Sequence, residues 1–427
     1  MTPRTTRSLV DLVLPVSGEE RTKSLLSFAL FAVFMASYYA LKPVRGSLYV
    51  HYLGAERLPH AYIGAVGVSL VAMAIYNRVF LRIGGERLLP ATVVLLCGCA
   101  LVFRLVHAAG AAPGPLSVVL FLWVTLYGAL VAALFWSLAN DIFDSRTGRK
   151  VYGFVGIGGL VGALVGSAVT HLIVQLRLAE TEDLLILGGL LVLGTLPLMR
   201  RLRRLAGPPT SSPPGEPRPR RRDGWYWIIS DAYVAGMAAL VFLFTFVGTF
   251  LDLQYNRVVQ AALPGKDAKT AYFSRLYGWV NGLAVTIQLL VTGPLHRRWG
   301  PLPGLLPLPA IGVVAPLVLI FRPTLTAVTL VWALGLALLY SLNQASKELL
   351  YIPTPPEVKY GAKGHIDVTF YRLGDALASA LAIIFDQTLG QRSVELAGLC
   401  LAMVAVWFVL VAALGRGYRR RLAGAHP

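Results

Sequence analysis

The sequence predicts an all-α membrane protein with about twelve transmembrane helices. Apolar stretches of roughly twenty residues recur about twelve times along the 427 residues, and each could cross about 30 Å of hydrocarbon as a helix. Hydrophobic residues make up 56% of the chain and charged residues 14%, against about 25% charged in soluble domains. A basic, proline-rich segment at residues 200–224 divides the stretches six and six, which predicts two six-helix bundles.

The helices follow in order from the apolar runs and the polar turns between them. We expect them near Ser24–Lys42, His60–Phe80, Leu88–His107, Pro115–Asn140, Val151–Gln175, Asp183–Met199, Ala232–Tyr255, Ala271–Gly293, Leu302–Phe321, Pro323–Ser346, Ile366–Gln387 and Val394–Gly415. The first range is longer than the apolar part of a signal peptide and lacks a small-residue cleavage site, so we expect it to remain as the first span.

These ranges imply five segments. They are a cytoplasmic N-terminal segment (1–23), an N-terminal six-helix bundle (24–199), a basic proline-rich cytoplasmic linker (200–224), a C-terminal six-helix bundle (225–415) and a basic cytoplasmic tail (416–427). The arginine- and proline-rich composition of the linker is typical of an extended connection between bundles.

The positive charges are distributed unevenly between alternate loops. The formal net charge is +18, and most Lys and Arg residues fall in the two termini, the linker and every second loop. By the positive-inside rule, both termini and the linker are expected to face the cytoplasm. The basic excess then reflects topology and attraction to anionic membrane lipid, and we expect no nucleic-acid partner.

The sequence lacks the short motifs of common enzyme classes. It contains no Walker phosphate loop, no His-Glu-x-x-His and no Gly-x-Ser-x-Gly elbow. The glycine run Gly156–Gly162 departs from the dinucleotide-binding spacing and fits close helix packing better. Cys97, Cys99 and Cys400 all fall in apolar helices and are expected to be packing residues. We therefore expect a protein that is not an enzyme and carries neither a cofactor nor a metal.

The two halves of the chain resemble each other. Helix four ends in Ser137-Leu-Ala-Asn-Asp and helix ten in Ser341-Leu-Asn-Gln, and a polar loop follows each. Arg45 and Asp252 occupy matched positions of helices one and seven, with opposite charge. Such repeats favour a parallel two-fold arrangement of halves, as in a major-facilitator-like fold.

Charged residues within the expected spans are costly and are therefore candidates for function. The candidate substrate-binding residues are Lys42, Arg45, Asp252, Arg372 and Asp375. Two alternatives remain open. Lys42 and Arg45 could instead extend toward lipid head groups, and Arg372 and Asp375, three residues apart, could form an internal ion pair.

Several motifs carry a resemblance to a known family. They are Leu41-Lys-Pro-Val-Arg-Gly-Ser-Leu48, Leu134-Phe-Trp-Ser-Leu-Ala-Asn-Asp141, Gly148-Arg-Lys-Val-Tyr-Gly-Phe-Val-Gly156, Lys347-Glu-Leu-Leu-Tyr-Ile-Pro353 and Gly361-Ala-Lys-Gly-His-Ile-Asp367 followed by Arg372-Leu-Gly-Asp375. Together they resemble the nucleotide translocases, the ATP/ADP antiporters of plastids and obligate intracellular bacteria. The resemblance implies a divergent bacterial member, placed as a multi-pass protein in the inner membrane.

The resemblance also implies four charged transport positions, two basic and two acidic. The basic position of helix one matches Arg45, and the acidic position of helix seven matches Asp252. The acidic position of helix four falls on Thr125, which carries no charge, and the basic position of helix eleven falls on Asp375, with reversed sign. The expected partner is an anionic small molecule, which ATP and ADP exemplify, bound by a monomer.

Alternating access requires a closure on each side of a central site. The matched positions predict an outer gate between Arg45 and Asp252. The inner gate is predicted between Asp141 and Lys347, and Asn140 and Glu348 lie next to them. Semi-exposed pairs of this kind contribute about 1 kcal/mol or less, so neither state is locked.

The predicted function is that of a secondary active transporter, which exchanges a nucleotide or a related organic or phosphorylated anion. Two alternatives remain. One is a proton-coupled carrier of a non-nucleotide metabolite, with Asp375 taking up the proton. The other is a non-transporting membrane scaffold or sensor. The charged residues retained in helices one, seven and eleven favour transport, since a scaffold has no need of them.

Overall fold

The computed structural model describes residues 16, 18–143, 145–206, 224–355, 357–389 and 393–424. Within these residues, twelve helices are long and apolar enough to cross a membrane. The predicted all-α class and number of spans are therefore confirmed, and the protein is a multi-pass membrane protein. Of the expected linker, residues 200–206 continue a helix and residues 207–223 lie outside the described part of the chain.

The chain forms two compact units, and each is drawn from both halves of the sequence. Unit 1 comprises Met1–Tyr52, Val68–Pro214 and Gly265–Gly282, and unit 2 comprises Leu53–Gly67, Gly215–Pro264 and Leu283–Pro427. The beginning of the second span (Leu53–Gly67) therefore belongs to unit 2, whereas most of the first half of the chain belongs to unit 1. The beginning of the eighth span (Gly265–Gly282) belongs to unit 1, whereas most of the second half belongs to unit 2. Hydropathy carries no information on this exchange, because it reports length and polarity but not partners.

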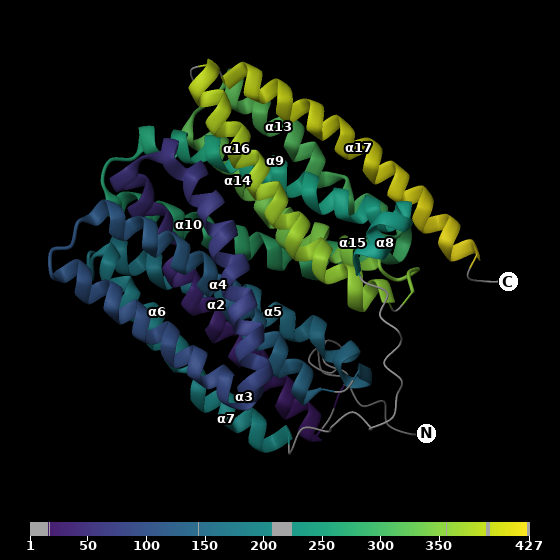
Figure 1. The fold of residues 1–427 in the computed structure, drawn as a ribbon, viewed down its shortest axis with the longest axis horizontal. Helices are drawn as coiled ribbons and strands as arrows, with labels where there is room; N and C mark the ends of the chain where they lie inside the picture. The colour runs from purple at the N-terminus through teal and green to yellow at the C-terminus, as the bar shows by residue number, and fades with distance from the viewer. Residues whose placement is uncertain are drawn as a thin grey trace, which may run out of the picture. The chain divides into compact units, whose positions relative to one another are not determined.

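Unit 1 is built from long helices joined by short turns (Figure 1). They are α2 (Gly18–Leu53), α3 (Leu58–Ala108) from Val68 onward, α4 (Pro113–Ile142), α5 (Ser145–Gln175), η2 (Thr181–Asp183), α6 (Leu184–Leu193), α7 (Thr195–Ala206) and the first part of α10 (Lys266–Ile287). Pro113 opens α4 at its first turn, where a missing N–H costs no helical hydrogen bond. Glu19 and Glu20 lie in the first turn of α2, where negative charge stabilises the positive end of the helix dipole.

Glycines allow α5 to approach α2 closely. A Cβ atom at Gly162 would lie 2.0 Å from the carbonyl oxygen of Ala32, and one at Gly166 would lie 2.4 Å from that of Ala36. Any larger residue at these positions would force the two helices apart. The predicted packing role of this glycine run is confirmed at Gly162, and the close approach continues at Gly166.

Unit 2 is centred on α9 (Ala232–Ala262), which packs against η1 (Ala55–Arg57), α13 (Pro307–Phe321), α14 (Leu325–Leu338), α16 (Tyr371–Leu389) and α17 (Ser393–Gly424). The other elements are α8 (Gly224–Ser230), η3 (Gln288–Thr292), α11 (Gly293–Trp299), α12 (Leu302–Leu305), η4 (Leu339–Asn343), α15 (Gln344–Leu349), η5 (Val358–Ala362) and η6 (His365–Phe370). Figure 1 shows α17, in yellow, running along α13 and α9. Asp231 caps α9, and its carboxylate accepts hydrogen bonds from the backbone N–H groups of Tyr233 and Val234.

Two features of the helices differ from expectation. Helical hydrogen bonding continues through all of α3, although the second and third spans were expected to be separated by a loop near Gly84 and Gly85. Glycine weakens a helix by about 1 kcal/mol but does not block it as proline does. Short π-helical segments also interrupt the later spans, and η6 ends at Phe370, two residues before Arg372. Such segments are frequent at functional sites.

Candidate functional site

Lys42 and Arg45 lie in the second half of α2, three residues apart, so their side chains project from one face of the helix. Lys42 is 9% exposed and Arg45 is half-buried. A cation within a membrane-spanning helix is costly unless its surroundings stabilise it. The contacts of these two side chains therefore define the candidate site in unit 1.

Aromatic rings surround the Lys42 ammonium. Its Nζ atom lies 4.2 Å from the ring centroid of Tyr277, 4.9 Å from that of Tyr39 and 5.9 Å from that of Tyr38. The rings of Tyr39 and Tyr277 meet edge to face, with centroids 5.8 Å apart and planes at 88°. This arrangement is favourable for aromatic pairs and fixes both ring faces.

Arg45 is held by the helix-four position at which the family resemblance implies an acidic residue. Its Nη1 atom donates a hydrogen bond of 2.8 Å to the Thr125 hydroxyl, and that hydroxyl donates in turn to the carbonyl oxygen of Phe121 at 2.7 Å. The guanidinium carbon also lies 4.6 Å from the centroid of the Phe121 ring. A neutral acceptor thus orients the Arg45 guanidinium.

Asp252 lies on α9 in unit 2, and its carboxylate accepts a hydrogen bond from the Tyr62 hydroxyl. Tyr62 comes from the beginning of α3, within the segment that joins unit 2. Arg257, just over one turn beyond Asp252, forms an ion pair with Asp386 of α16. The polar residues near this end of α9 are therefore connected to α3 and α16.

Asp375 is 7% exposed and accepts hydrogen bonds from two side chains. The Thr249 hydroxyl donates at 2.6 Å, and Arg372 Nη1 approaches the other carboxylate oxygen at 3.4 Å. The ion pair weighed for Arg372 and Asp375 is thus formed. Thr249 and Asp252 lie three residues apart on α9, so the hydroxyl that binds Asp375 and the Asp252 carboxylate share one face of that helix.

The candidate gating residues near the ends of helices four and ten have partners within their own units. Tyr152 donates a hydrogen bond of 2.9 Å to Asn140, and Asp141 is exposed in the last turn of α4. In unit 2, Lys347 forms an ion pair of 2.7 Å with Asp367, and Glu348 forms one of 2.6 Å with Lys363. The family motifs at Lys347–Pro353 and Gly361–Asp367 therefore bind each other through two crossed ion pairs.

The phenol of Tyr351 lies beside these crossed pairs. The Lys363 ammonium lies 5.3 Å from its ring centroid, and burial raises the pKa of the Tyr351 hydroxyl, with the Asp367 and Glu348 carboxylates adding to the effect. The Tyr351 hydroxyl is therefore protonated and uncharged beside these ion pairs at physiological pH.

Sequence reasoning missed the residues that surround the predicted charges, namely Tyr38, Tyr39, Tyr62, Thr249 and Tyr277. It also missed the polar contacts of the first part of α10 within unit 1. There, Lys266 pairs with Glu182 at 2.6 Å, and Thr181 donates through its hydroxyl to Asp267 at 2.6 Å. Tyr38 and Tyr39 lie four and three positions before Lys42, so the sequence could have indicated them as its neighbours. The partners that are distant in sequence carry no such signal.

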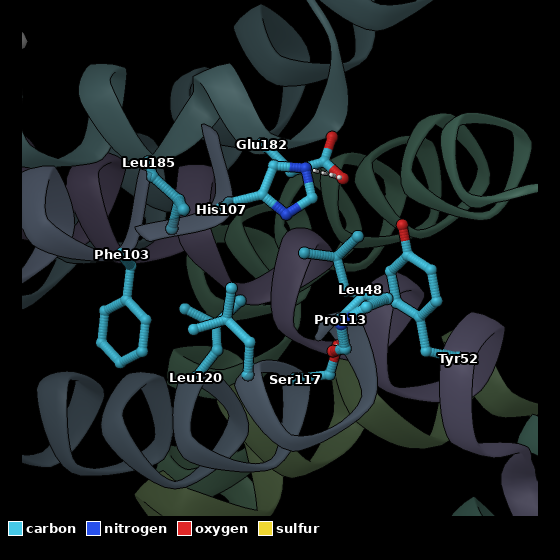
Figure 2. Close-up of a pocket in the computed structure, with 10 residues that line it drawn as sticks. Leu48, Tyr52, Phe103, His107, Pro113, Ser117, Leu120, Glu182 and Leu185 are labelled. Atoms are coloured by element: carbon cyan, nitrogen blue, oxygen red, sulfur yellow. Dashed lines mark hydrogen bonds and ion pairs between the residues drawn. The ribbon is translucent and has the colours of Figure 1, made fainter. Parts of the chain in front are cut away.

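Figure 2 shows a second polar group in unit 1, where His107 and Glu182 point toward one another. Their Nε2 and Oε1 atoms lie 3.4 Å apart, beside a cavity of about 10 Å³ lined mainly by apolar residues such as Leu48, Phe103 and Leu185. A cavity of this size has room for about one water molecule, so it cannot hold a metabolite. Among the described residues, no group of three or more His, Cys, Asp or Glu is placed to hold a metal ion.

Comparison with known proteins identifies a family model over part of the chain. Residues 312–418 match the model described as TLC ATP/ADP transporter. The chain is 23% identical over 335 residues to ADP,ATP carrier protein 1 of Chlamydia pneumoniae, covering 68% of this chain and 65% of that protein. It is 22% identical over 333 residues to ADP,ATP carrier protein 2, chloroplastic, of Arabidopsis thaliana, covering 69% and 53%. The chain therefore spans less than two-thirds of the length of these relatives, and the predicted family resemblance is confirmed.

Solved structures share the fold at lower sequence identity. A crystal structure of the POT family transporter PepTSo matches with a TM-score of 0.64 and 14% identity, covering 93% of this chain and 98% of that one. A bacterial homologue of the human lysosomal transporter Spinster, crystallised facing inward, matches with a TM-score of 0.59 and 12% identity, covering 95% and 98%. These likenesses confirm the predicted major-facilitator-like fold.

Proposed function

We propose that this member of the nucleotide translocase family is a secondary active transporter, which exchanges a nucleotide or a related phosphorylated anion across the membrane by alternating access. The observation that carries the proposal is the pair of cations, Lys42 and Arg45, on one face of α2. Both are kept inside a membrane-spanning helix, where Lys42 lies against the Tyr277 ring and Arg45 donates a hydrogen bond to Thr125.

Phosphate binding calls for cations and for directed donors. Arginine presents a planar fork of N–H groups that matches phosphate oxygens, and lysine acts as a point charge. Thr125 orients the Arg45 guanidinium through one N–H group. The proposal places the substrate phosphates against Arg45 and Lys42, with Arg372, Asp252 and Asp375 as the contribution of the C-terminal half.

The names of the relatives support the nucleotide class. The proteins of Chlamydia pneumoniae and Arabidopsis thaliana named above are ADP,ATP carriers. The charge pattern of this chain departs at Thr125 and Asp375 from the pattern that the resemblance implies, so the transport test includes anions other than nucleotides. The proposed orientation places both termini and the basic linker in the cytoplasm, with the chain acting as a monomer in the bacterial inner membrane.

Exchange is tested with the purified full-length protein in liposomes loaded with ADP. We expect uptake of labelled ATP that depends on internal ADP and that disappears in Arg45→Ala, with Trp279→Leu as a matched control because Trp279 is 72% exposed on α10. Internal and external panels of other nucleotides, phosphosugars and organic acids identify the anion class. If the wild-type protein exchanges none of these compounds, the transporter proposal fails and the scaffold or sensor alternative is favoured.

A second candidate function, a proton-coupled carrier, is favoured by one observation. Asp375 is a buried carboxylate in the position where the resemblance implies a cation, and it is the acceptor for Thr249. A carboxylate that takes up a proton during the cycle would couple uptake to a pH gradient. We expect Asp375→Asn to lose the response of uptake to an imposed pH gradient, with Thr249→Val as a control that keeps the carboxylate. An unchanged response in Asp375→Asn excludes Asp375 as the proton carrier.

A further inference from the structure

One exposed face of α17 changes from apolar to basic toward the end of the helix. Val406, Val409 and Ala413 form an apolar stripe, because they are exposed and follow one another at spacings of three and four residues. Arg416 and Arg420 continue the same stripe and are exposed as well. Exposed apolar side chains of a membrane-spanning helix contact lipid acyl chains, so the arginines that follow lie at the depth of the lipid head groups.

The other side of the same segment is docked against the beginning of α9. The Arg421 Nη2 atom donates hydrogen bonds to both carboxylate oxygens of Asp231, at 2.6 Å and 2.8 Å. The Arg421 guanidinium carbon also lies 4.7 Å from the centroid of the Tyr233 ring, against which Gly417 packs closely. Figure 1 shows this last part of α17 at the end of unit 2 that also carries α8. The docking leaves the basic face of α17 directed away from the bundle.

A second basic segment adjoins this part of α17. Arg297 and Arg298 are exposed in the last turn of α11, and α12 follows them. The Leu302 side chain of α12 packs against Gly415, where a Cβ atom would lie 2.6 Å from Leu302 Cδ1. Trp299 is exposed, and the Arg298 guanidinium carbon lies 4.9 Å from its ring centroid. An exposed tryptophan beside arginines is typical of the boundary between membrane and water.

The charge and shape of these side chains suit phosphate groups. Basic residues at the depth of the head groups attract anionic lipids, and a guanidinium presents a planar fork of N–H groups that matches two phosphate oxygens. A zwitterionic head group is a poorer partner, because its positive group is repelled. Two adjoining segments can bind two phosphates of one head group. Their exposed arginines are Arg297, Arg298, Arg416, Arg419 and Arg420.

We propose that the ends of α17 and α11 form a binding site for an anionic phospholipid whose head group carries two phosphates, of the cardiolipin type. The three exposed arginines of α17 bind one phosphate, Arg297 and Arg298 bind the other, and an acyl chain lies along the apolar stripe. The site is separate from the proposed transport site and does not depend on the identity of the transported anion. In the orientation proposed above, it faces the cytoplasmic leaflet.

The test follows amide hydrogen–deuterium exchange of the full-length protein in a neutral detergent while cardiolipin is added. We expect cardiolipin to slow exchange in residues 295–305 and 413–424. In the triple variant Arg416→Gln/Arg419→Gln/Arg420→Gln, the cardiolipin fraction that gives half-maximal protection should rise about fivefold for each arginine removed. The triple lysine variant at the same positions keeps the charge and should retain most of the protection.

A matched control separates this site from a general effect of charge. Arg322 is exposed and follows α13 at the end opposite to α12, so Arg322→Gln should respond to cardiolipin as the wild type does. All these variants replace exposed side chains, so their unfolding temperatures without cardiolipin should equal that of the wild type. Cardiolipin should raise the unfolding temperature of the wild type more than that of the triple glutamine variant.

The proposal is overturned if the triple glutamine variant and the wild type reach half-maximal protection at the same cardiolipin fraction, or if Arg322→Gln weakens protection as much. Equal protection by phosphatidylcholine would show that acyl chains bind without the phosphates. Equal protection by phosphatidylglycerol, which has one phosphate, would contradict the two-phosphate site. Equal protection by inorganic pyrophosphate in the absence of lipid would show that the arginines bind a soluble anion instead.

Discussion

Arg45 donates a hydrogen bond of 2.8 Å to the hydroxyl of Thr125, which joins the first and fourth spans within unit 1. At these two positions the family resemblance implies one basic and one acidic residue. In this chain a neutral hydroxyl stands at the second of these positions and accepts the hydrogen bond from Arg45. The Thr125 hydroxyl thus orients the guanidinium through one of its N–H groups.

Removal of the Thr125 hydroxyl is expected to weaken substrate binding. Hydrogen bonds to charged groups contribute about 1.5–3 kcal/mol, so Thr125→Val should raise the ATP concentration for half-maximal exchange by at least about tenfold. Thr125→Ser keeps the hydroxyl and should behave like the wild type. Exchange kinetics in proteoliposomes measure this concentration for both variants. Equal kinetics in Thr125→Val and Thr125→Ser would show that this hydrogen bond does not contribute to substrate binding.

Charge reversal tests the predicted outer gate between Arg45 and Asp252. Arg45→Asp should be inactive, and the double variant Arg45→Asp/Asp252→Arg should recover part of the exchange if the two residues attract one another during the cycle. Tyr62→Phe serves as the control, since it removes the hydroxyl that donates to Asp252 without changing charge. A double variant as inactive as the single one argues that Arg45 acts in substrate binding alone.

Lys347 has two candidate ion-pair partners at the predicted inner gate. Within unit 2 it is paired with Asp367 at 2.7 Å, whereas the repeat pattern predicts Asp141 as its gating partner. Lys347→Asp should inactivate exchange, because it places two carboxylates together. Rescue by Asp367→Lys would assign Lys347 to the pair within unit 2, and rescue by Asp141→Lys would assign it to a gate. We expect Asp141→Lys to restore exchange and Asp367→Lys to restore thermal stability in the Lys347→Asp background.

The ion pair between Lys266 and Glu182 is expected to stabilise the docking of the first part of α10 in unit 1. Glu182 is 2% exposed and lies 2.6 Å from the Lys266 ammonium. Loss of one partner of a buried pair costs about 3–5 kcal/mol, because the other charge stays buried without compensation. Lys266→Met should therefore lower the unfolding temperature in detergent more than the double variant Lys266→Met/Glu182→Gln. A single variant that is no less stable than the double variant would show that Glu182 is compensated by other groups, of which His107 at 3.4 Å is the nearest candidate.

Hydropathy and charge predicted the spans of this protein because a bilayer imposes its own length and polarity on each helix. The twelve spans, the close packing at the glycines of α5 and the family motifs all followed from local patterns of residues. The charged residues within spans could be recognised for the same reason, since an ionisable group is conspicuous in an apolar run.

The partners of those charges depended on the tertiary structure. Lys42 meets Tyr277, some 235 positions away in sequence by their numbers, and Arg45 meets Thr125. Asp375 meets Thr249, and Asp252 meets Tyr62. Periodicity along one helix says which face a side chain occupies but not which other helix that face meets. Helix order and charge placement were therefore readable from the chain. The contact of Lys42 with Tyr277 and the assignment of the α3 and α10 segments to the two units arise instead from packing between helices, which local sequence patterns do not encode.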